Sequence, residues 1–131
     1  MFWEDINVKL QGTGIELTDA IVDYVVKRVT NLGKLLKKVH EAGGDVIVFF
    51  DVGKTTDHHR QGQVFQAECS ITIDGKQYYA TYNDENLYAA IDEVKDIIFR
   101  DIKKDRDKQQ TLYKRGAAQL KNLARSIKFW K

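Results

Sequence analysis

Apolar residues recur at spacings of three and four between residues 83 and 108, and this period predicts a long amphipathic helix. Its apolar stripe consists of Leu87, Ile91, Val94, Ile98 and Ile102. Asn83 or Asp84 is the expected N-cap, because short polar side chains bind the free backbone N–H groups of a first turn. Lysine and arginine crowd the last two turns, where they complement the negative end of the helix dipole. The same cations also suit a polyanionic partner.

Four further segments have the patterns of β-strands. The expected strands are residues 5–11, 45–54, 64–73 and 76–82. Three of them alternate between apolar and polar residues, and the second is rich in β-branched and aromatic residues. Asp74-Gly75 between the last two strands is typical of a two-residue hairpin turn. The polar segment 54–63 predicts an exposed loop.

A second amphipathic helix is predicted between the first two strands. Thr18 is its expected N-cap, and Gly43-Gly44 ends the unit. The core face of this helix consists of Ile21, Val25, Val29, Leu32 and Leu36. Most of its lysines lie on the other side.

The predicted order of elements is therefore β-α-β-β-β-α. Short links and a hairpin favour strand neighbours that run antiparallel, with the helices gathered on one side. We expect an α+β fold: a two-layer sandwich in which two helices pack on one face of a four-stranded, mostly antiparallel sheet.

The composition is that of a small globular protein. The chain has 131 residues, of which 43% are hydrophobic and 31% charged. No apolar run approaches the roughly 20 residues of a membrane-spanning helix, and the N-terminus lacks the pattern of a signal peptide. A single cysteine, Cys69, excludes a disulfide framework and a multi-cysteine zinc site. We therefore expect a cytoplasmic protein.

Positive charge is concentrated towards the C-terminus. Residues 1–94 contain 9 Lys and Arg against 15 Asp and Glu, whereas residues 95–131 contain 12 against 4. Such a split indicates contact with nucleic acid or a membrane surface. We expect a folded domain over residues 1–108, followed by a basic tail, residues 109–131. That tail either forms another helix after Gly116 or stays disordered until it meets a partner.

Two adjacent histidines in the polar loop are the strongest candidates for catalytic or metal chemistry. His58 and His59 follow Asp57, but neighbouring side chains in a loop diverge and no further ligands are nearby in the sequence. The pattern favours an exposed loop, and a small nuclease using one of these histidines stays an alternative. Cys69 lies on the apolar face of its strand, which predicts a buried, inert thiol. We predict no catalytic residue, no metal ion and no cofactor.

Three segments carry a resemblance to a known family. They are INVKLQGTGIELTDAI, HHRQGQVFQAECSI and ENLYAAIDEVKDIIFRDIKK. The most specific piece runs from Asn86 to Asp92, with a basic run one to three turns later. Together with the order of elements, these segments resemble the ribosome hibernation promoting factors and ribosome-associated inhibitors of bacteria over about residues 6–108.

The resemblance implies a protein that binds the small ribosomal subunit through 16S rRNA, in the channel where tRNA and mRNA would lie. It implies that translation is inhibited under stress or in stationary phase, and that idle ribosomes are preserved. The expected partners are the 30S subunit and the 70S ribosome, with no membrane and no small-molecule substrate. Phosphate contacts fit such a task, because they supply affinity and position without reading sequence.

The same resemblance implies that rRNA is bound by basic residues on the two helices. These are Lys27, Arg28, Lys34, Lys37, Lys38, Arg100, Lys103, Lys104 and Lys108. One departure is that Ile97 follows Asp96, where the family often has lysine, with Lys95 as a candidate substitute. Three aspartates among residues 101–107 also dilute the positive charge.

The chain is closer in length to the short members of this family than to the long ones, which add a dimerisation domain. Whether it pairs ribosomes or keeps single 70S particles stays open. A general double-stranded RNA-binding module is the main alternative, because the last five elements repeat the α-β-β-β-α order of such domains. That alternative predicts binding to any RNA duplex, whereas the family resemblance predicts a preference for the 30S subunit.

Overall fold

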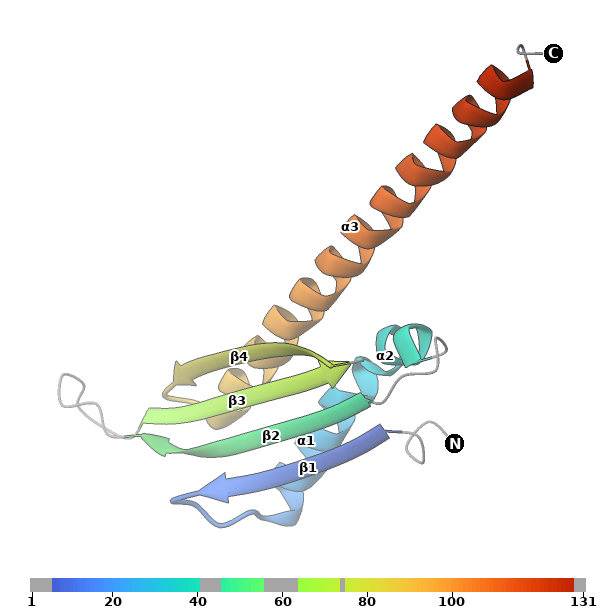
Figure 1. The fold of residues 1–131 in the computed structure, drawn as a ribbon. Helices are drawn as coiled ribbons and strands as arrows, with labels where there is room; N and C mark the ends of the chain where they lie inside the picture. Colours follow the sequence, from blue (N-terminus) through green and yellow to red (C-terminus); the bar gives the residue numbers. More distant parts are fainter. Residues whose placement is uncertain (1–5, 41–45, 56–63, 74, 129–131) are drawn as a thin grey trace. The chain divides into compact units, whose positions relative to one another are not determined.

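The computed structural model describes residues 6–40, 46–55, 64–73 and 75–128; the side chains of residues 6, 38–40 and 123–128 are outside this description. Figure 1 shows the elements in chain order. They are β1 (Ile6–Thr13), α1 (Asp19–Asn31), α2 (Gly33–His40), β2 (Val46–Thr55), β3 (Val64–Ile73), β4 (Lys76–Asp84) and α3 (Leu87–Lys128). The chain forms two compact units, residues 1–100 and 101–131.

The four strands form one sheet in the order β1-β2-β3-β4. β1 pairs with β2 in parallel, with Ile6 opposite Val46, because the helical segment between them carries the chain back to the same end. The two other pairs are antiparallel. Gly75 turns the β3–β4 hairpin with a φ of 81°, a left-handed conformation that glycine adopts without strain. The predicted α+β fold with a mostly antiparallel sheet is confirmed.

The helices of the first unit cover one face of this sheet (Figure 1). The strands contribute alternate side chains to the core between the two layers, among them the fully buried Val48, Phe50 and Ile71. The helices contribute the stripes that their period predicts, and Val29 and Ile91 are completely buried. Burial of these side chains is the main force that holds the two layers together.

The predicted first helix is divided into α1 and α2 at Leu32. The backbone N–H of Leu32 donates to the carbonyl of Val29 at 3.0 Å, three residues back instead of four, so the last turn of α1 tightens. Gly33 follows, and glycine is a poor helix former. Leu32 and Leu36 are both fully buried, as their spacing predicts. Packing therefore continues through a break that the apolar period does not reveal.

The N-cap of α3 is Asn86, so the prediction of Asn83 or Asp84 is wrong. The side-chain oxygen of Asn86 accepts hydrogen bonds from the backbone N–H groups of Tyr88 at 2.9 Å and Ala89 at 3.3 Å. Asp84 is the last residue of β4, and its carboxylate accepts from the Asn86 N–H at 2.8 Å. Strand pairing thus extends two residues further than the sequence pattern indicates.

α3 continues without interruption through Gly116, so no separate helix begins there. Within the described residues, no helix combines the length and the apolarity that crossing a bilayer needs. The predicted division at residue 108 stays a prediction.

Candidate nucleic-acid interface

A polar cluster in the first unit joins α1 to the start of α3. The guanidinium Nε of Arg28 donates to one carboxylate oxygen of Asp92 at 2.5 Å. The hydroxyl of Tyr24 donates to the other oxygen at 2.7 Å. The Arg28 guanidinium also lies 4.1 Å from the centre of the Tyr24 ring, and the edge of Tyr88 packs on Tyr24 at 4.7 Å between ring centres. One carboxylate therefore holds two side chains of the neighbouring helix.

These contacts shift the ionisation of all three groups. Partial burial by itself raises the pKa of Asp92, but the hydrogen bonds from Arg28 and Tyr24 outweigh it and hold the pKa below its ordinary value. The hydrogen bond to Asp92 raises the pKa of Tyr24 and that of Arg28. Arg28 is thus a charged residue whose guanidinium is already engaged, and only 26% of its side chain is exposed.

The lysines predicted on the first helix differ from Arg28, because their side chains extend into solvent. Lys27 on α1 and both Lys34 and Lys37 on α2 are exposed. Within the part of the chain that the structure describes, none of these three forms an ion pair. The side chain of Lys38 lies outside the described residues. Their charges are therefore accessible to a partner, and their role in binding stays a prediction.

Arg100 is the last residue of the first unit, and its side chain is exposed. Its guanidinium Nε donates to the backbone carbonyl of Asp96 at 3.3 Å. Lys95 pairs with the Asp96 carboxylate at 2.7 Å and has 21% of its side chain exposed. Lys95 is thus engaged within its own helix.

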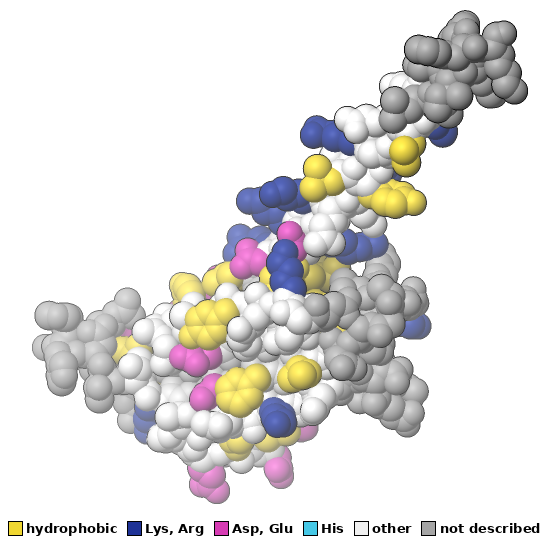
Figure 2. Space-filling model, viewed as in Figure 1, with side chains coloured by type: hydrophobic (Ala, Val, Ile, Leu, Met, Phe, Trp, Pro, Cys, Tyr) yellow, Lys and Arg dark blue, Asp and Glu magenta, His cyan; other side chains and the backbone are white. Residues whose placement is uncertain are grey.

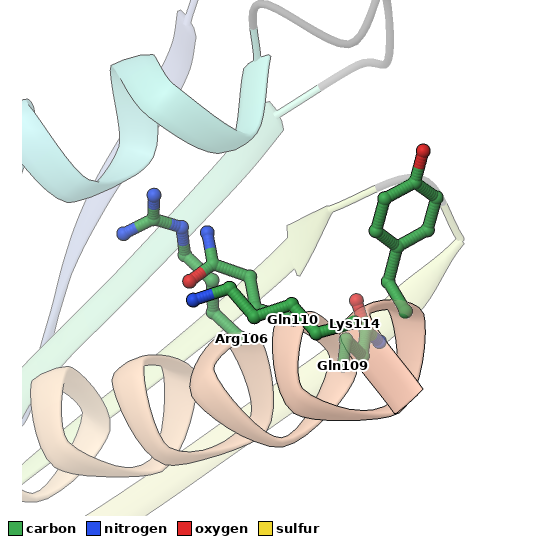
Figure 3. A pocket seen from close by; sticks show the side chains of 5 residues that line it. Arg106, Gln109, Gln110 and Lys114 are labelled. Carbon is green, nitrogen blue, oxygen red and sulfur yellow. The ribbon is translucent and has the colours of Figure 1, made fainter. Parts of the chain in front are cut away.

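In the second unit, the predicted residues Lys103, Lys104 and Lys108 are all exposed on α3. Figure 2 shows that Lys and Arg side chains continue along this part of the helix. Arg106, one of the cations that the sequence pattern places in the last two turns, borders a hollow together with Tyr113 and Lys114, and sequence reasoning did not single out Lys114 (Figure 3). Tyr113 and Lys114 follow Arg106 by seven and eight residues. This spacing places the three side chains on one side of a helix, and it could have identified them from the sequence.

The two units differ in charge. Residues 1–100 contain 11 Lys and Arg against 16 Asp and Glu, a net charge of −5, whereas residues 101–131 contain 10 against 3, a net charge of +7. The lysines of α1 and α2 therefore belong to an acidic unit. The positive charge that attracts a polyanion from a distance is concentrated in the second unit.

The sheet face opposite the helices exposes aromatic and acidic side chains together (Figure 2). Tyr79 on β4 is 54% exposed, and Phe49 lies in the same cross-strand row. Asp51 and Glu68 form the next row. Asp51 and Glu68 are half-buried, and their carboxylates repel phosphates, so this sheet face suits RNA less well than the helix surface that carries the exposed lysines does.

The described residues also bear on the catalytic and metal alternatives. Cys69 is buried as predicted, and burial raises the pKa of its thiol to about 12, so the reactive thiolate is absent at neutral pH. Among the described residues, no group of three or more His, Cys, Asp and Glu side chains is arranged to hold a metal ion. His58 and His59 lie outside the described residues.

Comparisons with known proteins give a consistent set of relatives. The sequence model of the family described as Sigma 54 modulation protein / S30EA ribosomal protein matches residues 8–110. A ribosome hibernation promoting factor of Pseudomonas putida is 28% identical over 113 residues, which cover 86% of this chain and 99% of that protein. A ribosome hibernation promotion factor of Picosynechococcus is 33% identical over 106 residues, which cover 79% of this chain and 50% of that protein.

Two solved structures share the fold. The N-terminal domain of Protein Y from Thermus thermophilus is 27% identical, with a TM-score of 0.55 and coverage of 75% of this chain and 97% of that one. A ribosomal subunit interface protein from Coxiella burnetii has a TM-score of 0.57 at 10% identity, covers 77% of this chain and 98% of that one, and supports the fold alone. The relatives are ribosome-associated factors and not enzymes. With residues 8–110 matched and the expected fold observed, the chain belongs to the Sigma 54 modulation protein / S30EA ribosomal protein family, which includes the ribosome hibernation promoting factors.

Proposed function

We propose that this protein is a ribosome hibernation factor that binds the small ribosomal subunit through 16S rRNA, in the tRNA and mRNA channel, and inhibits translation under stress or in stationary phase. The observation that carries the proposal is the family match over residues 8–110, together with relatives that are named ribosome hibernation promoting factors. The proposed partners are the 30S subunit and the 70S ribosome, and the proposed location is the cytoplasm.

The exposed lysines on α1 and α2 supply the chemistry for this task. Lys27, Lys34 and Lys37 extend from helices whose opposite sides are fixed in the core, so their charges are held at defined positions. The hydrogen bonds of Asp92 to Arg28 and Tyr24 add a polar link between α1 and α3. A rigid array of cations selects a folded RNA by its shape, because it matches phosphates that are themselves fixed.

Charge removal at two of these lysines tests the proposal. The double variant Lys34→Gln with Lys37→Gln should weaken binding to purified 30S subunits and flatten the log–log dependence of affinity on salt by roughly 0.7–0.9 for each phosphate that is no longer bound. Inhibition of cell-free translation should weaken in parallel. The matched control is Lys9→Gln with Lys54→Gln, which removes the same charge from exposed positions on the strands.

The control variant should bind 30S subunits as the wild type does. Equal weakening in both double variants would contradict a defined interface on α1 and α2. An RNA duplex that competes as well as the 30S subunit would instead favour the general double-stranded RNA-binding alternative. Translation that is insensitive to saturating protein would overturn the hibernation role.

A further inference from the structure

Five side chains of the second unit gather on one side of α3, and we call them the extension cluster. They are Arg106, Gln109, Gln110, Tyr113 and Lys114. Their positions differ by three, four, seven and eight residues from Arg106, which places them on neighbouring turns of one helix side. They border a hollow with a volume of about 590 Å³. Figure 3 shows how their side chains extend from the helix.

The cluster combines cations with an aromatic ring that plays no part in the core. Tyr113 is 80% exposed, and exposure of a whole aromatic ring to water has no benefit for stability. Arg106 precedes it by seven residues and Lys114 follows it directly, and within the described part of the chain neither cation forms an ion pair. No acidic residue occurs in residues 109–131.

The family match covers only part of this surface, because Arg106, Gln109 and Gln110 lie within it. The match ends at residue 110, so Tyr113 and Lys114 lie beyond it, whereas the helix continues to Lys128. The Tyr113 ring and the Lys114 charge therefore lie outside the matched residues.

We propose that the extension cluster is a second RNA-binding site, which takes an unpaired stretch of RNA. The Tyr113 ring stacks on one base, Arg106 and Lys114 contact neighbouring phosphates, and the glutamine amides hydrogen-bond to base edges or sugars. The eight residues from Arg106 to Lys114 span about 12 Å of helix. This is the length of three to four stacked nucleotides at roughly 3.4 Å each.

Charge favours RNA over a second copy of the chain as the occupant. Residues 101–131 contain 10 Lys and Arg against 3 Asp, so two copies that met through this surface would repel each other on balance. An RNA strand instead brings one negative charge per nucleotide to these cations. Aromatic rings beside cations are the usual means by which proteins hold single strands without reading their sequence.

Fluorescence anisotropy of the full chain with single-stranded oligouridylate tests this site. The probe has about 12 nucleotides, a length within the usual size of such binding sites. Tyr113→Ala should weaken binding about 5- to 100-fold, because the ring that stacks on one base is removed. Tyr113→Phe keeps the ring and should bind like the wild type. Tyr113→Leu keeps apolar bulk without the aromatic face and should bind as weakly as Tyr113→Ala.

Two arginines of α3 give a matched pair of variants. Arg106 and Arg115 are nine residues apart, which is two and a half turns, so they lie on opposite sides of the helix. Arg106→Gln should weaken oligouridylate binding and lower its salt dependence by roughly 0.7. Arg115→Gln should leave both nearly unchanged. Equal effects of the two variants would overturn a defined site, because they would show that only total charge matters.

The inference rests on the proposed function for its natural ligand, rRNA. Different experimental results would nevertheless overturn the second RNA-binding site and the hibernation role. Loss of 30S binding in Lys34→Gln with Lys37→Gln, with no effect of Tyr113→Ala on oligouridylate, would overturn the extension cluster alone. Oligouridylate binding that depends on Tyr113, with no binding to ribosomes, would overturn the hibernation role alone. Self-association that disappears in Tyr113→Ala, without RNA binding, would show that the surface binds another copy of the chain and would overturn the proposal.

Discussion

At the scale of single residues, Asp92 makes the best-defined polar contacts between helices. It accepts hydrogen bonds from Arg28 and Tyr24, which precede it by 64 and 68 residues in sequence. A helical period identifies which side of a helix is apolar, but it does not tell which charged residues of two helices meet. For this reason the family resemblance placed Arg28 among several cations as if they were equivalent, whereas its guanidinium is held by a carboxylate.

Removal of the Asp92 charge should lower stability in a pH-dependent manner. Because the folded state holds the Asp92 pKa below its ordinary value of 3.8, the stability from this charge is present above that pH and is lost as the pH falls through the folded-state pKa. Asp92→Asn should therefore lower the Tm by about 2–5 °C at neutral pH. The difference from the wild type should shrink as the pH falls below 3.8.

Thermal unfolding followed by circular dichroism between pH 2 and pH 7 measures this difference. Asp96→Asn is the control, because Asp96 is more exposed than Asp92 and, among the described residues, its carboxylate forms an ion pair with its neighbour Lys95 alone. A Tm difference for Asp92→Asn that persists unchanged at pH 2 would show that the cluster stabilises by packing and not by charge.

Gly53 is a second residue whose identity the structure explains. A Cβ added there would lie 2.4 Å from the backbone carbonyl oxygen of Thr13, on the paired strand β1. Gly53→Ala should therefore destabilise the first unit by about 1–3 kcal/mol, since backbone must move. Gly116→Ala is the matched change in open space on α3, and it should be neutral or stabilising by up to about 1 kcal/mol. Denaturant unfolding would measure the free energy of unfolding of both variants. An equal change in the two would show that the added Cβ at residue 53 does not clash with β1.

At the scale of elements, alternation and helical period predicted the strands, the hairpin and the core faces because these depend on local pattern and burial. The break at Leu32 was missed because apolar spacing continues through it, and only the hydrogen bond to Val29 tightens the turn. The cap at Asn86 was missed because several capping residues follow each other there. Because Asp84 pairs with Phe65 in the sheet, the helix begins after it, and Asn86 is the N-cap.

Charge reversal on α3 tests whether that helix contributes to ribosome binding. Lys103→Glu with Lys104→Glu should weaken 30S binding and reduce the salt slope by roughly 0.7–0.9 for each phosphate that the variant no longer binds. Both side chains are exposed, so the fold should be unaffected. Lys9→Glu with Lys54→Glu applies the same change in charge to the strands and serves as control. An unchanged slope in the α3 variant would place these lysines outside the interface.

At the scale of the whole molecule, the net positive charge and the family match lie largely in different parts of the sequence. The matched residues, 8–110, lie mostly in the unit with a net charge of −5, and the unit with a net charge of +7 extends beyond them. Under the proposed function, shape recognition and electrostatic attraction would be supplied by different parts of the chain. Residue counts alone show the uneven charge, since charge needs no knowledge of contacts, whereas the boundary of the two units depends on contacts.

The most direct test of ribosome binding is sedimentation of the full chain with a mixture of 30S and 50S subunits through a sucrose gradient at low salt. We expect the protein in the 30S fractions, and in the 70S fractions when magnesium joins the subunits. Protein that remains at the top of the gradient, or that travels with the 50S subunit, would contradict the account.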